Sequence, residues 1–444
     1  MSGNKSVYLN LIPHKKGFFI KSKGLPLYIS ILLLPHMATP GKYDILIYLH
    51  FNEPITFNDL ENVFRGNILF EDLNTQILYR HIRELIHSDF VLKFPLSDTR
   101  GYIYTLNRGN DSLIDHLSFL MWCRKEGIDY NKILNLKTEA LILNILELKN
   151  ITYDGLLISS KMSAKTIRKH ISNLIESRFI HMIRQKPIVF EFLVNDVTLW
   201  YLTMKGLPIP DIDRKFNDSI SKMDANRDIT RSQEIMDKLI KLHIYSSTVT
   251  EGNTASNEDV ERIINDLPTN LTPKEIIEIK NTKDALELVI ESYKDTDLNI
   301  DFIKTTHQIL MRGLMKEAGM FFASSTKRIV GSKLKLPSTN KEIEYLMSSL
   351  MSFYHLNKNH IHPLILGSIF HFLFVSIHPF KDGNGREARL IHSFILLKSG
   401  YPIFAFDPER KFDYFNYLEK GRESDVIDFV RFIINEHKNI LPER

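Results

Sequence analysis

The sequence has little cysteine and no long apolar run. Its single cysteine, Cys123, can form no disulfide within the chain and excludes a zinc site built from cysteines. The lack of a disulfide framework is typical of a reducing compartment. The longest apolar run, residues 25–34, is interrupted by Pro26 and Ser30 and is far shorter than the roughly 20 residues of a membrane-spanning helix. It also begins too late, and lacks the cleavage pattern, for a secretory signal, so we expect a cytoplasmic protein.

The size and charge of the chain suggest several domains of different character. With 444 residues the chain is too long for one ordinary core. Its composition, 43% hydrophobic and 25% charged without a low-complexity tract, is that of a globular protein. The net charge of +4 comes from residues 1–215, because the remainder has slightly more acidic than basic side chains. A polyanionic partner would therefore bind the first half.

Residues 138–194 have the pattern of three helices followed by a hairpin. Thr138 and Ser163 are the expected N-caps of the first and third helices. The third helix has an apolar stripe made of Ile167, Ile171, Leu174 and Ile175. Short extended runs are expected at residues 151–152, 181–184 and 188–192. This is the order of a winged helix-turn-helix domain, whose third helix enters the major groove in DNA-binding members.

Basic side chains gather around this third helix. One acid, Glu176, accompanies seven basic residues there, namely Lys161, Lys165, Arg168, Lys169, Arg178, Arg184 and Lys186. The first four are candidate contacts to duplex DNA. The alternative is that the domain docks a protein or dimerises, because fold alone does not decide function.

A similar order of elements occurs earlier in the chain. Helices are expected at residues 43–50, 57–64 and 74–87, and strands at 90–94 and 102–106, separated by a turn over 97–101. Acids lie near its third helix, namely Glu71, Asp72, Glu84 and Asp89. This copy is therefore less suited to contact DNA.

From residue 231 onward the pattern is almost wholly helical. The expected helices cover 232–246, 257–265, 273–292, 300–314, 340–357, 361–377, 385–398, 410–420 and 425–436. Extended propensity is confined to residues 327–336. The predicted fold is mainly α, an all-helical core with a small β-hairpin flap, preceded by two winged helix-turn-helix (α+β) domains. The predicted boundaries are an N-terminal segment (1–40), a winged-helix-like domain (41–107), a helical linker (108–135), a winged helix-turn-helix domain (136–206) and the helical domain (207–444).

The stretch FVSIHPFKDGNGREARL, residues 374–390, places a dense polar cluster between two apolar helical segments. The segment Gly383-Asn384-Gly385 can place successive backbone N–H groups around one concavity at the N-terminus of the next helix, where an anion is favoured. Arg386 and Arg389 are three residues apart, so they share a helix face and can hold the same phosphates.

Two further side chains complete this cluster. Asp382 is an acid beside a polyphosphate site, where Mg²⁺ takes its protein ligand. His378, at the end of the preceding helix, can accept a proton from an attacking hydroxyl. The cluster therefore describes a nucleotide-phosphate site with a base, and the sequence has no lysine P-loop.

Residues 378–389, HPFKDGNGREAR, match the motif of Fic-domain proteins, which have the Fido fold. The resemblance covers roughly residues 217–437 and does not extend to residues 1–210. It implies adenylylation, in which AMP is transferred from ATP to a Tyr, Thr or Ser hydroxyl of a target protein or of the chain itself, and pyrophosphate leaves.

The resemblance also implies a role for each motif residue. His378 would be the general base, and Asp382 would hold Mg²⁺ across the α- and β-phosphates. The nucleotide-binding residues would be Phe380 as apolar anchor, Asn384 at the α-phosphate, the Gly383 and Gly385 amides at adjoining oxygens, and Arg386 and Arg389 at the outer phosphates.

A second stretch, STVTEGN at residues 247–253, resembles the inhibitory motif of the same family. It implies that Glu251, within a motif that includes Ser247, Gly252 and Asn253, pairs with Arg389 and displaces the γ-phosphate. The inhibitory helix would cover residues 232–253, so no separate inhibitor protein is required. In some relatives the same glutamate aligns a water that removes AMP, which leaves the removal of AMP open as another activity.

The segment before the flap departs from the family pattern. Many relatives have an arginine at the fourth position of this segment, whereas residues 319–324 are GMFFAS. The flap, with Ile329, Val330 and Gly331, is expected to dock the target by strand addition. His371, seven residues before His378, is expected to pack in the core rather than act as a second base.

Two functions therefore compete. The first is a Mg²⁺- and ATP-dependent protein adenylyltransferase that Glu251 inhibits. The second is a DNA-binding transcriptional regulator whose Fic domain senses a nucleotide or modifies the chain itself. Some relatives use UDP- or CDP-linked donors, and no residue pattern here indicates which nucleotide base is bound, so the identity of the donor stays open. Whether the chain forms a homodimer stays open as well.

Overall fold

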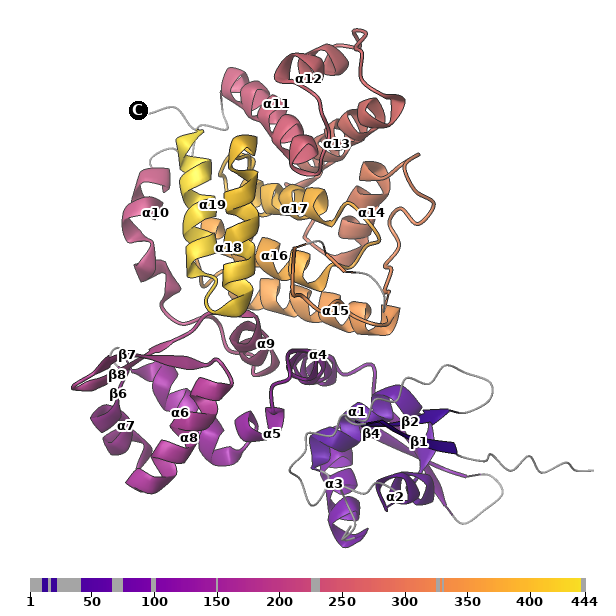
Figure 1. Ribbon diagram of the computed structural model, residues 1–444, viewed down its shortest axis with the longest axis vertical. Coiled ribbons are helices and arrows are strands. Elements are labelled where there is room, and N and C mark those ends of the chain that lie inside the picture. Colours follow the sequence, from indigo (N-terminus) through magenta and orange to yellow (C-terminus); the bar gives the residue numbers. More distant parts are fainter. Residues whose placement is uncertain are drawn as a thin grey trace, which may run out of the picture. The chain divides into compact units, whose positions relative to one another are not determined.

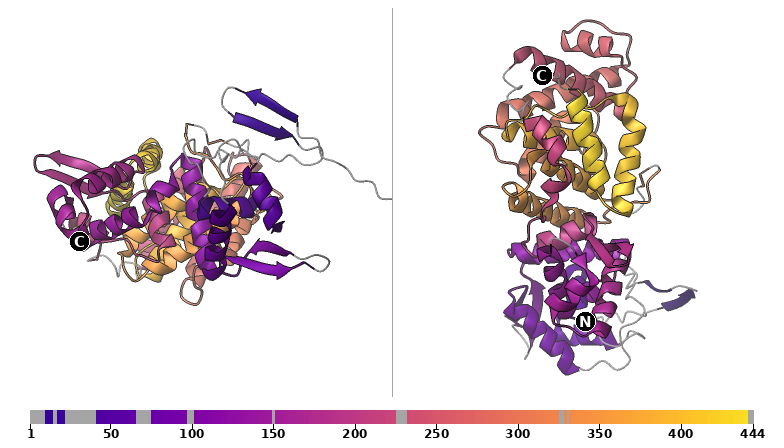
Figure 2. Two further views of the ribbon diagram at one scale, coloured as in Figure 1. Left: turned by 90° about the horizontal axis from the view of Figure 1, so that it is seen from below. Right: turned by 90° about the vertical axis from the view of Figure 1, so that its left-hand side faces the viewer.

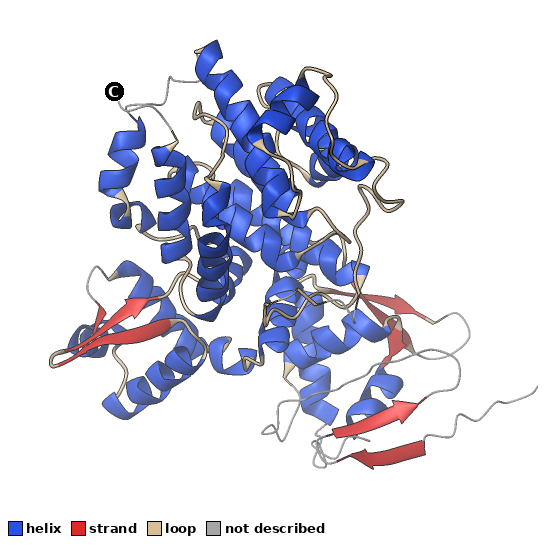
Figure 3. Ribbon diagram, turned by 45° about the horizontal axis from the view of Figure 1, so that its top comes forward, coloured by secondary structure: helices blue, strands red, loops and turns tan. Residues whose placement is uncertain are grey.

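The computed structural model describes residues 10–14, 17–21, 41–65, 75–96, 101–148, 151–224, 232–324, 328–329 and 331–440. The chain divides into two compact units, Met1–Gly109 and Asn110–Arg444. It is mainly helical, as predicted, with two small three-stranded antiparallel sheets and one two-stranded sheet (Figures 1 and 3).

The first unit contains the earlier of the two predicted repeats. Its helices are α1 (Lys42–Asn52), α2 (Phe57–Arg65) and α3 (Thr75–His87), and its sheet consists of β3 (Ile55–Thr56), β4 (Val91–Pro95) and β5 (Tyr102–Leu106) in the order β3-β5-β4. The predicted sequence of three helices and a hairpin is confirmed. The expected acids Glu71 and Asp72, and residues 97–100 of the expected turn, lie outside the described residues. A hairpin that the sequence did not suggest, β1 (Asn10–His14) and β2 (Gly17–Lys21), precedes these elements.

The second unit begins with the other repeat. Its elements are α4 (Asp111–Glu126), α5 (Tyr130–Ile133), α6 (Leu136–Glu147), β6 (Ile151–Thr152), α7 (Tyr153–Ser160), α8 (Ala164–Glu176), β7 (Ile180–Gln185), β8 (Ile188–Phe192) and α9 (Asp196–Met204). The sheet order is β6-β8-β7. The helix–helix–helix–hairpin order is again confirmed.

Local details of this repeat differ from the sequence-based expectations. Ser163 caps α8 as expected, since its side chain accepts a hydrogen bond from the Thr166 amide. The cap of α6 is Asn135 and not Thr138, which lies within the helix with its hydroxyl 2.8 Å from His170 Nδ1. Ile175 is 43% exposed and does not belong to the buried face of α8, which consists of Ile167, His170, Ile171 and Leu174.

The rest of the second unit is a helical bundle. Its helices are α10 (Asn217–Asp224), α11 (Gln233–Thr250), α12 (Asn257–Ile264), α13 (Pro273–Ser292), α14 (Ile300–Leu310), α15 (Asn340–Asn357), α16 (Pro363–Ile377), α17 (Asn384–Lys398), α18 (Lys411–Glu423) and α19 (Ile427–Asn439). Every residue of α16 from Leu364 to Ile377 is buried, and α15, α17 and α19 pack around it. Figure 2 shows α18 and α19 side by side at the end of the chain. No helix within the described ranges is long and apolar enough to cross a membrane.

The predicted β-hairpin flap is not formed by the part of residues 327–336 that the structure describes. Residues 328–329 and 331–336 contain no strand, and Lys327 and Val330 lie outside the described residues. The Ser332 amide donates to the Ile329 carbonyl at 3.1 Å, which makes a turn. A strand needs a hydrogen-bonded neighbouring strand, and the described sheets include none of these residues. The segment instead contacts helices through its side chains, because Lys333 pairs with Glu423 at 2.9 Å and Lys335 donates to the Lys125 carbonyl.

Candidate active site

The polar cluster of the sequence forms a tight loop between α16 and α17. His378 ends α16 in the left-handed conformation, with φ 56° and ψ 58°, and its amide donates to the Phe374 carbonyl. Gly383 precedes α17 with a φ of 76°. A Cβ atom at Gly383 would lie 2.7 Å from Met311 Sδ. This position therefore requires glycine both for its backbone conformation and for space.

Asn384 closes the loop on itself. Its Oδ1 accepts a hydrogen bond from the Phe380 amide at 2.9 Å, and its Nδ2 donates to the Phe380 carbonyl at 2.9 Å. The resemblance assigns Asn384 to the α-phosphate. The contacts described here give the side chain a structural role in shaping the loop.

His307 on α14 contacts the loop between α16 and α17, and the sequence analysis did not identify this residue. Its ring stacks on Phe380 with centroids 3.6 Å apart and planes 6° apart. Nδ1 lies 2.9 Å from the Gly319 amide and accepts its proton, so Nε2, 2.9 Å from the Asp382 carbonyl, donates there. Burial lowers the pKa of His307 to about 4, which keeps this neutral tautomer at physiological pH. The only hint in the sequence is that His307 falls on the same face of an amphipathic helix as Ile303 and Leu310.

Arg389 is buried and bound by α11. Only 1% of the residue is exposed, yet its guanidinium carries a full charge. Nε donates to Ser247 Oγ at 2.9 Å, and Nη2 donates to the Ser247 carbonyl at 3.1 Å and to Glu251 Oε1 at 2.7 Å. The ion pair expected between Glu251 and Arg389 is therefore present.

The Glu251 carboxylate lies against the start of α17. A Cβ atom added to Gly385 would collide with Glu251 Oε1, so the carboxylate in this position lies directly against the Gly385 backbone. The N-terminus of a helix favours an anion. Glu251 thus lies beside Gly385 and Arg389, two of the residues that the sequence analysis expects to bind phosphate.

The other arginine of the motif, Arg386, is also buried. Only 3% of it is exposed. Its Nη1 lies 3.8 Å from Glu278 Oε1 and its Nη2 lies 3.9 Å from Asp382 Oδ2. Both arginines of the motif are therefore buried and face a carboxylate from another part of the chain.

Residues 297–396, from the segment before α14 into α17, match the protein-family model described as Fic/DOC family. The chain contains a Fic/DOC family domain.

Relatives of this Fic domain include proteins named protein adenylyltransferase Fic. The one from Nematostella vectensis is 29% identical over 241 residues, which are 51% of this chain and 55% of the relative. The one from Culex quinquefasciatus is 27% identical over 233 residues, 48% of this chain and 44% of the relative. The chain thus spans about half the length of the curated relatives it matches. A solved Fic domain containing signaling protein from Bacteroides thetaiotaomicron is 24% identical, covers 51% of this chain and 94% of its own, and has a TM-score of 0.45.

Asp382 is the acid of the Fic loop that could hold a metal. Its side chain is 68% exposed, and its Oδ1 accepts a hydrogen bond from the Gly383 amide. Within the described ranges no group of three His, Cys, Asp or Glu side chains could hold a metal by itself. Mg²⁺ is usually bound by one or two carboxylates together with substrate phosphates and waters, and the exposed Asp382 side chain is a carboxylate of this kind.

His378 and the segment before the flap meet beside this loop. His378 is half-buried, and the carbonyl of the next residue, Pro379, accepts a hydrogen bond from the Phe322 amide at 2.9 Å. Ile329 is half-buried and Gly331 exposed in the same region of the chain, while Val330 is not among the described residues. His371 is fully buried with its Nε2 2.7 Å from the Tyr414 hydroxyl, as expected for a core residue.

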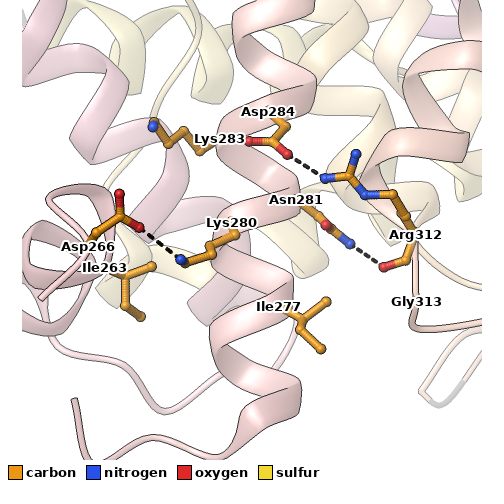
Figure 4. Close-up of a pocket in the computed structure, with 9 residues that line it drawn as sticks. All are labelled: Ile263, Asp266, Ile277, Lys280, Asn281, Lys283, Asp284, Arg312 and Gly313. Atoms are coloured by element: carbon orange, nitrogen blue, oxygen red, sulfur yellow. Dashed lines mark hydrogen bonds and ion pairs between the residues drawn. The ribbon is translucent and has the colours of Figure 1, made fainter. Parts of the chain in front are cut away.

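The second unit also has a surface hollow that contains none of the predicted site residues. It has a volume of about 440 Å³ and lies between α12, α13 and the segment after α14 (Figure 4). Its Lys280 and Arg312 form ion pairs with Asp266 and Asp284. Because these charges are already neutralised, the hollow offers no clear site for phosphate.

The basic residues named as DNA contacts lie apart from the Fic loop. Lys165, Arg168 and Lys169 are exposed on α8, and Lys161 is exposed at the end of α7. Arg178 does not belong with them, because its guanidinium donates to the Arg422 carbonyl and pairs with Glu126 and Asp196. It joins the hairpin repeat to the C-terminal end of α18.

Proposed function

We propose that the chain is a protein adenylyltransferase that transfers AMP from ATP to a hydroxyl of a target protein or of itself. The observation that carries the proposal is the single loop that holds His378, two buried arginines and a glycine-rich helix start. The arginines and the N-terminus of α17 suit the phosphates of ATP. The relatives named protein adenylyltransferase Fic support the same activity.

In the proposed reaction the target oxygen attacks the α-phosphorus of ATP. Its proton passes to His378, the bond from the α-phosphorus to the oxygen that bridges to the β-phosphorus breaks, and pyrophosphate leaves. Arg386 and Arg389 hold the outer phosphates. When bound, Mg²⁺ neutralises charge on the phosphates, and Asp382 is the residue that would hold it.

Glu251 inhibits this reaction in our proposal. Its carboxylate already forms a charged hydrogen bond with Arg389 and lies on Gly385. An ATP γ-phosphate that bound there would meet a like charge and lose one of its two arginines. ATP would then bind in an unproductive pose. The same carboxylate could orient a water that removes AMP, and loss of AMP release in a Glu251→Gly protein would identify that activity.

Intact-protein mass spectrometry tests the proposed chemistry. The Glu251→Gly protein, incubated with ATP and Mg²⁺ alone and with cell lysate, should place one AMP on itself or on a lysate protein. His378→Ala in the same background should transfer none while titration calorimetry still detects ATP binding. Absence of transfer by Glu251→Gly would reject the activity, and equal loss of ATP binding in His378→Ala would make His378 structural.

A second candidate function is binding of duplex DNA through α8. We interpret the two repeats as winged helices, and Lys165, Arg168 and Lys169 fall at i, i+3 and i+4 on α8, one helix face. Among the residues that the structure describes, these three and Lys161 form no ion pair with an acid, so their charges remain available to phosphate. A polyanionic helix groove is the partner that such a face fits.

DNA binding is tested with the full chain and a labelled duplex. Affinity should fall steeply as salt rises, and replacing Lys165, Arg168 and Lys169 by alanine should weaken it at least tenfold at low salt. Replacing the ion-paired Lys238 on α11 is the matched control. If the wild-type chain fails to bind DNA at low salt, the repeats serve to dock protein instead.

A further inference from the structure

The turn that carries Glu251 is fastened to the first half of α13. Asn253, two residues after Glu251, is buried, and its Nδ2 donates to Glu278 Oε2 at 3.0 Å and to the Glu275 carbonyl at 3.3 Å. The next residue, Thr254, donates from its amide and hydroxyl to Glu275 Oε1. Side chains of α13 therefore hold the chain directly after the inhibitory glutamate.

Glu278 also faces Arg386, which follows the loop between α16 and α17. Its Oε1 lies 3.8 Å from Arg386 Nη1, and the two side chains are 14% and 4% exposed. Lys274 approaches the same oxygen at 3.8 Å, but that lysine is 76% exposed, so solvent screens the pair. One largely buried carboxylate thus contacts the inhibitory turn and lies near an arginine of the Fic motif.

We propose that Glu278 is a positioning residue that keeps Glu251 on Arg389. It acts through Asn253, because that contact has the length of a true hydrogen bond whereas the contact with Arg386 is loose. While the turn is docked, Glu278 also supplies counter-charge to Arg386. The inference rests on the proposed inhibitory role of Glu251, and it adds a second residue on which inhibition depends.

The test compares four variants by the initial rate of AMP incorporation from labelled ATP. Glu278→Ala and Asn253→Ala each remove the hydrogen bond and should raise the rate about three- to tenfold, the range expected for one lost hydrogen bond. Glu278→Gln keeps an acceptor for Asn253 and should recover most of the inhibition. The control is Glu287→Ala, also on α13, because Glu287 is half exposed and pairs only loosely with Lys283 at 3.6 Å.

A double-mutant comparison separates positioning from a direct effect on the nucleotide. If Glu278 acts through Glu251, Glu278→Ala should add no rate in the Glu251→Gly background. An equal gain in both backgrounds would overturn the inference. If Glu251→Gly raises the rate but neither Glu278→Ala nor Asn253→Ala does, the inference fails while the proposed inhibition stands.

Hydrogen exchange gives a readout that does not depend on activity. The amides of Asn253, Thr254 and Ala255 donate within the turn or to α13, at 3.0–3.1 Å. In the nucleotide-free protein they should exchange faster in Glu278→Ala and at the wild-type rate in Glu287→Ala. If Glu251→Gly does not raise the rate, the proposed inhibition is wrong, and exchange alone then decides whether Glu278 holds the turn. Unchanged exchange in Glu278→Ala would overturn the inference.

Discussion

The second unit should lose stability steeply in mild acid, because four histidines lie fully buried in its core. They are His243 on α11, His371 on α16, His392 on α17 and His437 on α19, and each is at most 1% exposed. Most of their ring nitrogens have no hydrogen-bond partner among the described residues. Burial lowers the pKa of His243 and of His437 to about 4, and it lowers the pKa of His371 and of His392 well below its usual value.

The sign of the effect follows from proton uptake on unfolding. In the unfolded chain a histidine has a pKa near 6.5. Below that pH the unfolded chain therefore binds protons that the buried histidines of the folded unit do not bind. The stability that neutral histidines contribute is fully present above about pH 6.5 and is lost as the pH falls towards 4. His307 adds a fifth such group, since burial lowers its pKa to about 4 as well.

Two buried carboxyls act in the opposite sense. Burial raises the pKa of Glu387 to about 8 and that of Asp115 to about 6. The folded unit keeps these protons between pH 5 and 6, whereas the unfolded chain has released them. Five protons taken up and two released leave about three, and at about 1.4 kcal/mol per proton the free energy of unfolding should fall by about 4 kcal/mol per pH unit. This is a large part of the roughly 5–15 kcal/mol that stabilises a typical domain.

Fluorescence of the two tryptophans can measure this slope. Trp122 and Trp200 are both buried in the second unit with ring centroids 5.7 Å apart. Denaturant titrations between pH 7.5 and 5 give the free energy of unfolding at each pH. His437→Phe should reduce the slope by about 1.4 kcal/mol per pH unit, while the same change at exposed His360 should not. A wild-type stability that is flat from pH 6.5 to 5, or an unchanged slope in His437→Phe, would refute the reasoning.

Two further predictions concern the loop between α16 and α17. His307→Ala should weaken ATP binding at least fivefold in calorimetry, because Phe380 loses its stacking partner and the Asp382 carbonyl loses its donor; unchanged affinity would mean that the loop holds its shape unaided. Gly383→Ala should lower the free energy of unfolding by about 1–3 kcal/mol, because it adds left-handed strain and a contact with Met311. Gly331→Ala is its control, because Gly331 has a φ of 78° but open space around the Cβ position. If the two substitutions lower the free energy of unfolding equally, the contact of the new methyl group with Met311 is relieved.

The sequence predicted the elements whose signals are local. Helix α13 begins at Pro273 after the cap Thr272, and both bounds agree with the prediction, because a capping box and an N-terminal proline define a helix start without tertiary contacts. The loop residues from His378 to Arg389 were found for the same reason, since they are contiguous. The ion pair between Glu251 and Arg389 followed from the family resemblance and not from spacing.

Features that depend on tertiary contacts were missed or wrongly predicted. His307 and Glu278 act on the site from helices α14 and α13, and no spacing in the sequence connects them with the loop. The hydroxyl of Thr138 suits a helix cap, but it lies in hydrogen-bond contact with His170 in the packed repeat, and Asn135 caps the helix. The described part of the expected flap, residues 328–329 and 331–336, has strand-forming residues but forms no strand, so its propensity does not decide its conformation.

The most direct test of the account is the rate of AMP transfer by Glu251→Gly compared with wild type, at equal ATP and Mg²⁺. The central claim is that Glu251 withholds Arg389 from the γ-phosphate. Removing the carboxylate should raise the initial rate at least tenfold, if relief of inhibition is worth more than about 1.4 kcal/mol in the transition state. Glu258→Gly, an exposed acid in the first turn of α12, should leave the rate unchanged. A Glu251→Gly protein that labels no faster than wild type would contradict the account.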